Sequence, residues 1–236
     1  MRVEIWTDIS CPWCYVGQAR FDKALAAFEH RDEVEVVHRS FQLDPRRVKG
    51  DAEPIVGHLM KGKGWTRAQA LANEENLRQQ SAAEGLPYVM GRDHGYTFDM
   101  HRLLHFAREE GRQHELLGLL YRANFAEERS VYDDDERLVE IAVRAGLDAD
   151  ATRAVLADPN AYAAHVRADL RAARAVGANG VPFFVLDGKF GVSGAQSTDM
   201  FARALDQAWQ SRSPVRVVAG AVDAHVCGPD GCPVPH

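Results

Sequence analysis

Two cysteines separated by two residues, in Cys11-Pro12-Trp13-Cys14, are the residues of this chain best suited to chemistry. The segment before them, 3–7, is rich in β-forming residues that alternate in character, and the segment after them, 15–30, carries apolar residues at helical spacing. The pair is therefore predicted to lie at the start of a helix, directly after a strand. The free N–H groups and the positive end of the helix dipole stabilise a thiolate there. A thiolate beside a second thiol is typical of enzymes that exchange disulfides.

The position of each cysteine on this helix predicts a separate role for it. Cys11 lies at or before the first helical residue, so we expect it to be the nucleophile, with its sulfur facing solvent. Cys14 lies one turn further in, where burial keeps its thiol protonated until it attacks the mixed disulfide as the resolving group. Pro12 fits the first helical turn, where its missing N–H costs little. Trp13 is expected to present an apolar surface to the substrate.

A second motif, Gly180-Val181-Pro182, lies directly before a predicted strand. We expect a cis peptide bond at this proline, which would turn the backbone of Val181 toward Cys11. The N–H and C=O groups of Val181 could then hold a substrate peptide in the manner of an added strand. A trans proline that simply begins a strand is the alternative.

The strands that must position these motifs lie at both ends of the chain. A second strand is predicted over 33–41, which completes a βαβ unit with the first strand and its helix. Strand character returns at 182–186 and 189–192, joined by Asp187-Gly188, a dipeptide typical of two-residue hairpin turns. A last helix follows, with Ser197 or Thr198 as its N-cap.

Between these strands, from about 51 to 176, the pattern is helical and no strand is obvious. Pro54 begins a short predicted helix, Thr66 and Asp99 are predicted N-caps of two longer ones, and Pro159 is predicted to open the last. The order of elements predicts an α/β fold: a thioredoxin-like core, βαβ…ββα, with an inserted all-helical domain. The predicted domains are 1–45 with 177–212 (the discontinuous core), 46–176 (the helical insertion) and 213–236 (a C-terminal extension).

Composition narrows the classes of function. The 236 residues carry a net charge of −6, and no run of lysine or arginine suggests a nucleic-acid partner. No stretch has the ~18 consecutive apolar residues that a membrane-spanning helix needs. The first residues form a charged strand rather than an apolar leader, so we expect a cytoplasmic protein with no membrane partner. In a reducing compartment, close cysteine pairs are more often catalytic, redox-sensing or metal-binding than structural.

The other two cysteines lie near the C-terminus, in Cys227-Gly228-Pro229-Asp230-Gly231-Cys232. The four residues between them suit a tight turn, which could bring the cysteines within the Cα separation of ~4.4–6.8 Å that a disulfide requires. We hypothesise a second redox pair that exchanges electrons with Cys11 and Cys14. The alternatives are a small disulfide clip, or an unpaired tail exposed to solvent.

A tetrahedral zinc site is a further alternative, built from the four cysteines with His225 and His236 nearby. The strand-to-helix setting of the first pair favours redox chemistry, so no metal and no organic cofactor are expected beyond the redox-active disulfide. Four other histidines have no carboxylate or third ligand placed beside them by the sequence, and no role is predicted for them: His94, His101, His105 and His114.

In combination, four motifs resemble the FrnE-like branch of the DsbA family of thioredoxin-fold oxidoreductases. They cover roughly residues 1–210 and are Cys11-Pro12-Trp13-Cys14, Phe41-Gln42-Leu43-Asp44-Pro45, Gly180-Val181-Pro182-Phe183-Phe184 and Val192-Ser193-Gly194-Ala195-Gln196. The resemblance implies a thiol–disulfide oxidoreductase or disulfide isomerase, with Cys11 as nucleophile, Cys14 as resolving thiol and Pro182 as the cis proline. It implies protein substrates that contain disulfides or thiols, and a thiol reductant that recycles the enzyme.

Two other classes of function remain open. Kappa-class glutathione transferases and 2-hydroxychromene-2-carboxylate isomerases resemble this layout, but typically use a single serine or cysteine where this chain has two cysteines. That class predicts a glutathione pocket and an activity that survives the loss of Cys14. A redox-regulated chaperone or binding module would instead use an apolar groove near Trp13, and would work without Cys11.

Overall fold

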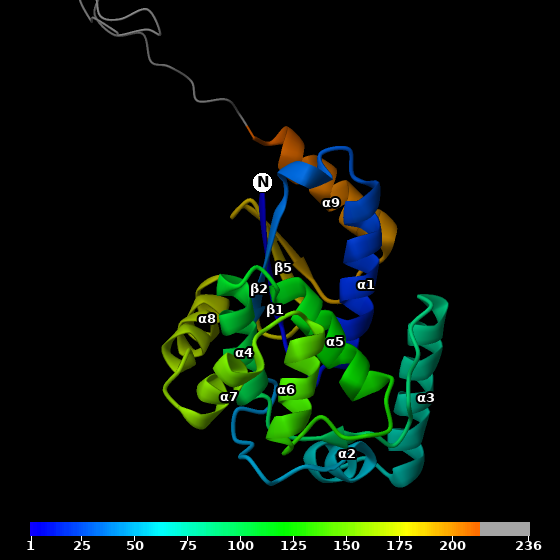
Figure 1. Cartoon of the computed structure of the whole chain (residues 1–236). Coiled ribbons are helices and arrows are strands. Elements are labelled where there is room, and N and C mark those ends of the chain that lie inside the picture. The colour runs from blue at the N-terminus through cyan, green and yellow to red at the C-terminus, as the bar shows by residue number, and fades with distance from the viewer. Residues whose placement is uncertain (213–236) are drawn as a thin grey trace, which may run out of the picture.

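The computed structural model describes residues 1–212, and the predictions made for 213–236, including the Cys227/Cys232 pair, lie outside the described residues. A four-stranded sheet in the order β2-β1-β5-β6 forms the centre of the molecule (Figure 1). Strands β1 (Arg2–Thr7) and β2 (Glu35–Ser40) are parallel, and β5 (Phe183–Leu186) pairs antiparallel with β1. The edge strand β6 (Phe190–Ser193) completes the sheet.

The turn between β5 and β6 forms where the sequence predicted it. Asp187 and Gly188 both have positive φ, 52° and 67°, which is the backbone conformation of a type I′ hairpin turn. Strands from the two ends of the chain are therefore joined in one sheet, because β5 adds directly to β1. This pairing brings the segment before β5 to the same end of the sheet as the cysteine pair.

Helices α1 (Pro12–Ala27) and α9 (Thr198–Gln210) pack against each other beside the sheet (Figure 1). Their apolar faces meet the sheet through an aromatic cluster, in which Phe184 lies 4.5 Å from Phe201 and 5.4 Å from Phe21 between ring centroids. Ser197 is the N-cap of α9, and its side chain accepts a hydrogen bond from the Met200 N–H. The predicted βαβ…ββα core is confirmed.

Seven helices of the described chain form the insertion between β2 and β5. They are α2 (Ile55–Lys63), α3 (Arg67–Ala83), α4 (Phe98–Glu109), α5 (Gln113–Phe125), α6 (Asp135–Arg144), α7 (Ala149–Ala157) and α8 (Ala163–Ala175). Helices α4 to α8 pack together below and beside the sheet. Helices α2 and α3 contact each other, α2 at the bottom of the view and α3 at its right edge (Figure 1). Thr66 is the N-cap of α3, as the sequence predicted, and it forms a reciprocal capping box with Gln69.

Three details of the insertion differ from the sequence prediction. Two short strands, β3 (Glu53–Pro54) and β4 (Asp93–His94), pair in a segment where none was expected. Thr97, not Asp99, precedes α4, because the Asp99 carboxylate instead binds Arg102 at 2.8 Å. Helix α8 begins at Ala163 rather than at Pro159, because Tyr162 adopts a left-handed conformation (φ 59°) that interrupts the helix.

The apolar core of the insertion extends beneath the cysteine pair. Ile9, Cys11, Cys14 and Tyr15 belong to the same buried cluster as the apolar residues of α4 to α7. The segments predicted as two domains thus share a continuous core at the motif, while the domain boundaries themselves stay a prediction. A short 3-10 helix, Arg31–Glu33, leads into β2.

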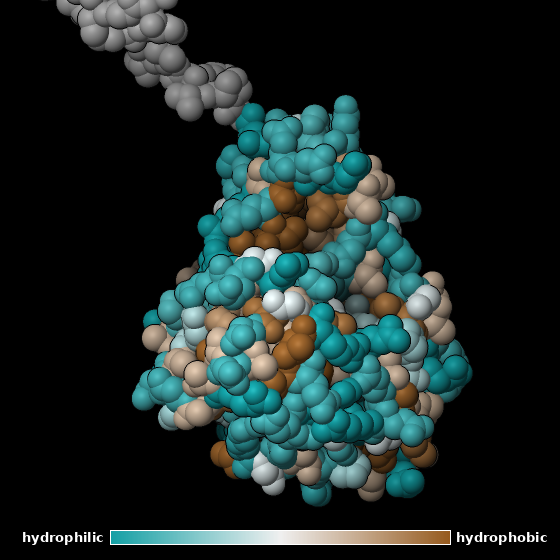
Figure 2. Space-filling model, viewed as in Figure 1, coloured by the Kyte–Doolittle hydropathy of each residue, from teal (hydrophilic) through white to brown (hydrophobic). Residues whose placement is uncertain are grey.

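One face of the molecule carries an apolar hollow between α1 and β2, visible as a brown patch in the upper part of Figure 2. The hollow is lined by Leu25, Ala26, Val34 and Val36. It lies away from the cysteine pair, so it is not part of the site described below. Within residues 1–212, no helix has both the length and the apolar character needed to cross a membrane.

Candidate active site

The cysteine pair lies at the junction of β1 and α1, as the sequence predicted. Cys11 is the N-cap residue of α1 and has an extended backbone, and Pro12 is the first helical residue. The Cys11 carbonyl accepts hydrogen bonds from the N–H groups of Cys14 and Tyr15, at 3.0 and 3.3 Å. Both cysteines are free thiols. Cys11 therefore lies at the N-terminus of α1, the positive end of the helix dipole.

The sulfur of Cys11 does not face open solvent, so that prediction is wrong. Only 3% of Cys11 is exposed, compared with 1% of Cys14. The Cys11 Sγ–H donates to the carbonyl oxygen of Val181 at 3.6 Å, and it lies in a cavity of about 470 Å³. Residues of the β2–α2 loop and of α2 and α3 form the other walls of this cavity, and a sequence pattern cannot place them there.

Cys14 has a different environment, on the interior side of the pair. Burial raises the pKa of its thiol well above the usual value, and the nearby Cys11 adds to this effect. The Thr7 side chain acts in the opposite direction, and it also hydrogen-bonds the hydroxyl of Tyr121. The Cys14 thiol is therefore protonated at neutral pH, as its predicted resolving role requires.

The peptide bond between Val181 and Pro182 is cis, the conformation predicted from the motif. The loop is held by α1 on one side, because a Cβ atom on Gly17 would lie 2.9 Å from the Pro182 ring. On the other side, the Pro182 carbonyl accepts a hydrogen bond from the Gly194 N–H at 2.8 Å. Trp13 borders the same cavity and is 37% exposed. Of the four predicted docking residues, Pro12, Trp13 and Val181 thus line the cavity with Cys11, and Pro182 follows Val181 through the cis bond.

A buried carboxylate that the sequence analysis missed lies three residues before Cys11. Asp8 is 1% exposed, and its carboxylate accepts a hydrogen bond from the Leu43 N–H at 2.8 Å and lies 3.4 Å from His101 Nε2. Burial opposes ionisation, but the nearby His101 and the hydrogen bond from the Leu43 N–H lower the pKa of Asp8 below its usual value. Asp8 therefore ties the loop before Cys11 to the loop after β2. Its position at the end of a buried strand was the signal available in the sequence.

The histidines left without a role have carboxylate partners that only the fold supplies. His101 faces Asp8, and one turn later His105 Nε2 lies 3.0 Å from the Asp169 carboxylate of α8. Asp169 also binds Arg39 of β2 at 2.9 Å. The pair on α4 thus links the helical insertion to the sheet.

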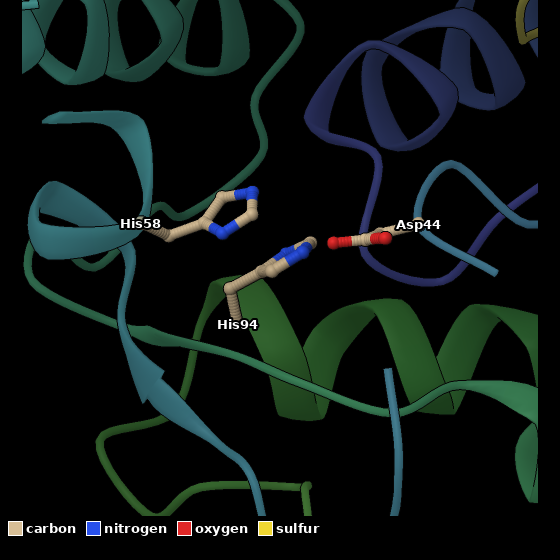
Figure 3. A group of neighbouring side chains, drawn as sticks. All are labelled: Asp44, His58 and His94. Atoms are coloured by element: carbon tan, nitrogen blue, oxygen red, sulfur yellow. The ribbon is translucent and has the colours of Figure 1, made fainter. Parts of the chain in front are cut away.

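The cavity beside Cys11 has both apolar and polar walls and carries charges of both signs. Arg46 and Lys63 lie on its walls, and so do Asp44, His58 and His94, whose side chains converge in Figure 3. Asp44 comes from the β2–α2 loop, His58 from α2 and His94 from β4, so three separate segments meet here. Sequence reasoning gave no sign of this cluster, since its members are 14 and 36 residues apart.

The two cysteines lie at the start of α1, which follows the central strand β1 of a four-stranded sheet, and they face a cis-proline loop. This arrangement defines a thioredoxin-fold dithiol protein. The model of the DSBA-like thioredoxin domain matches residues 2–206, which include both cysteines and the cis proline. The chain belongs to this family, and its helical insertion is the one that the family carries.

Relatives of the chain fit this assignment. A probable DsbA oxidoreductase from Streptomyces coelicolor is 62% identical, with full coverage of both chains and a TM-score of 0.92. The uncharacterised protein YwbO of Bacillus subtilis is 25% identical over 87% of this chain and 96% of its own length. The cytosolic disulfide reductase DsbM of Pseudomonas aeruginosa shares the fold, at 18% identity and a TM-score of 0.59 over 89% of this chain and 99% of that one.

Proposed function

We propose that this chain is a thiol–disulfide oxidoreductase that acts on protein disulfides through Cys11 and Cys14. The Cys11 thiolate attacks one sulfur of a substrate disulfide, which forms a mixed disulfide and releases one substrate thiolate. Cys14 then loses its proton and attacks the Cys11 sulfur, which closes the Cys11–Cys14 disulfide and releases the second substrate thiol. The substrate disulfide gains two electrons and two protons and becomes two thiols, while Cys11 and Cys14 are oxidised to a disulfide.

The difference between the two thiols carries this proposal. Cys11 borders a cavity that a substrate can enter, whereas Cys14 lies in the core and its pKa is raised by burial. A reactive outer thiol with a protonated inner thiol suits a two-step exchange, because the mixed disulfide persists until the inner thiol is deprotonated. Isomerisation of wrong disulfides uses the same first step, with release by a substrate thiol in place of Cys14.

The docking surface in this proposal consists of Pro12, Trp13, Val181 and Pro182 around Cys11. The Val181 carbonyl lies 3.6 Å from the sulfur, so a substrate strand paired with Val181 would bring its own sulfur close to Cys11. The exposed Trp13 ring would cover apolar residues that flank the substrate cysteine.

Recycling requires a thiol that reduces the Cys11–Cys14 disulfide, and we propose glutathione or a dithiol protein for this step. Arg46 and Lys63 border the cavity and are suited to the carboxylates of glutathione. A structure of DsbM has been solved with GSH, although that protein shares only 17% identity with this chain. A cytoplasmic location, the FrnE-like branch and a relay through Cys227/Cys232 are part of the same proposal. No cofactor other than the redox-active disulfide takes part in this exchange.

Insulin reduction and reactivation of scrambled ribonuclease test the proposal. Cys11→Ser is expected to lower both rates by at least on the order of 10³-fold, since the attacking sulfur is gone. Cys14→Ser is expected to accumulate a mixed disulfide with the substrate, detectable by mass spectrometry. The tail variant Cys227→Ser/Cys232→Ser leaves the first turnover intact and slows recycling if the relay operates. Full activity of Cys11→Ser would overturn the proposal.

A glutathione-dependent isomerase or transferase is the second candidate, favoured by the size of the cavity and by the cations on its walls. It differs from the first candidate in one measurable way. Turnover of a glutathione-dependent isomerisation substrate by Cys14→Ser at the wild-type rate would support this second class, whereas loss of all turnover supports the dithiol mechanism.

A further inference from the structure

The Asp44, His58 and His94 cluster lies in the cavity of Cys11 and has no part in the dithiol mechanism. Its ligand-type atoms all lie within 4.8 Å of one another, and it is the one such group among the residues that the structure describes. The rings of His58 and His94 stack with centroids 4.0 Å apart, and the His94 ring points toward the Asp44 carboxylate (Figure 3).

His94 provides an independent sign of a missing ligand. Its side chain is 5% exposed, and neither ring nitrogen has a hydrogen-bond partner within the described chain. An unpartnered buried imidazole is costly, and native proteins rarely leave one without a protein partner, a water molecule or an ion. Asp44, His58 and His94 all line the cavity of Cys11, so an ion in the cavity can reach all three residues.

We propose that Asp44, His58 and His94 form a binding site for a divalent cation of the Zn²⁺ type. Two imidazoles and one carboxylate are a common zinc donor set, and they leave the fourth tetrahedral position open to a water molecule or a substrate atom. Neutral imidazole is the form that binds metal.

A cationic side chain competes with the metal at this site. An Nη2 of Arg47 donates to His58 Nδ1 at 2.7 Å, and the Arg47 guanidinium lies 3.7 Å from the Asp44 carboxylate. The same guanidinium binds Glu53 at 2.6 Å and the Asp51 carbonyl at 2.8 Å. Arg47 can therefore withdraw from His58 and keep these other partners when a metal ion arrives.

This competition gives the proposal a test with effects of opposite sign. Arg47→Gln removes the competing charge and is expected to tighten Zn²⁺ binding about tenfold, by simple electrostatics at these distances. Asp44→Asn and His94→Ala each remove a ligand and are expected to weaken binding by at least about 100-fold. His114→Ala is the control, because its side chain is exposed on α5 outside the cluster.

Binding is measured on the full chain with Cys11, Cys14, Cys227 and Cys232 all replaced by serine, so that no thiolate takes the metal. Calorimetric titration with Zn²⁺ is expected to give one site per chain at neutral pH. Co²⁺ added to the same serine-substituted chain is expected to give visible absorption typical of tetrahedral nitrogen and oxygen ligands.

The absence of Zn²⁺ binding to the serine-substituted chain would overturn the proposal. Affinity unchanged by both Asp44→Asn and His94→Ala would overturn it as well, because the ion would then bind elsewhere, for example at His225 or His236. If His94→Ala fails to fold by circular dichroism, Asp44→Asn and His58→Gln decide the outcome, since both residues are partly exposed. This proposal does not depend on the dithiol mechanism.

Discussion

The two sides of the cysteine pair differ in polarity more than in exposure. Cys11 and Cys14 are both almost fully buried, yet Cys11 faces a cavity lined by charged and imidazole side chains, and Cys14 faces an aromatic core. In that core the rings of Tyr15 and Phe125 stack with centroids 5.1 Å apart. Burial by itself therefore does not set the role of each thiol. The space and polarity beside each sulfur do, because a substrate can enter only one side.

Loss of the Asp8 carboxylate is expected to have the largest effect on stability. Asp8 holds Leu43, which lines the cavity beside Cys11. Asp8→Ala leaves the Leu43 N–H and His101 without their buried partner, so the free energy of unfolding should fall by about 3 kcal/mol. Chemical denaturation measures this change.

Asp32→Ala is the control for Asp8, because Asp32 is 91% exposed and pairs only with the exposed Arg31. It should change stability by less than about 0.5 kcal/mol. Equal effects of the two substitutions would mean that the contacts of Asp8 do not secure the loop before Cys11.

Alkylation rates compare the two thiols directly. Iodoacetamide in excess should modify Cys11 at least about 100-fold faster than Cys14 at pH 7.5, because burial raises the pKa of Cys14 and excludes the reagent. Peptide mapping by mass spectrometry gives each rate in the single variants Cys14→Ser and Cys11→Ser. In strong denaturant the rates should become similar, and similar rates in the native protein would abolish the distinction between the two sides.

A methyl group on Gly17 tests how α1 holds the cis-proline loop above Cys11. The added Cβ would lie 2.9 Å from the Pro182 ring and 3.3 Å from the Ala195 backbone, so Gly17→Ala should lower the free energy of unfolding by about 2 kcal/mol. Insulin reduction should slow in parallel, since the loop must move away from α1.

Gly118→Ala is the matched control, in the middle of α5 with no atom within 4 Å of the added Cβ. It should raise stability by about 0.5–1 kcal/mol through helix propensity alone. A Gly17→Ala variant as stable as Gly118→Ala would show that the contact with Pro182 is not tight.

At neutral pH the smallest expected effect is that of His38, whose contribution to stability appears only in acid and lies away from both sulfurs. Burial, with the nearby His114, lowers the pKa of His38 to about 3. The unfolded chain binds a proton at this histidine below about pH 6.5 and the native chain does not, so stability falls as the pH drops from about 6.5 to 3. This one group contributes a slope of up to about 1.4 kcal/mol per pH unit.

His38→Gln should remove that contribution in urea unfolding measured at several pH values. A slope that is the same in His38→Gln and in the wild type would refute the assignment to His38.

Local patterns in the sequence determined most of the fold. The alternation in 3–7, the turn dipeptide Asp187-Gly188 and the capping residue Thr66 each act through neighbours within a few residues, so they predict the same element in any context. Errors arose where a tertiary contact competes with a local preference. Asp99 could cap a helix, but the buried Arg102 binds its carboxylate. Pro159 could open a helix, but the left-handed backbone of Tyr162 delays the helix until Ala163.

The sequence by itself determined that a dithiol lies at the start of a helix and that a proline loop follows far along the chain, because motif and periodicity are local properties. Only the tertiary structure decided what surrounds each sulfur. It buried Cys11 beneath the β2–α2 loop, placed Asp8 against His101, and brought Asp44, His58 and His94 into one cavity. The physical reason is that these contacts join segments separated by tens of residues, and their distances depend on how the helical insertion packs on the sheet.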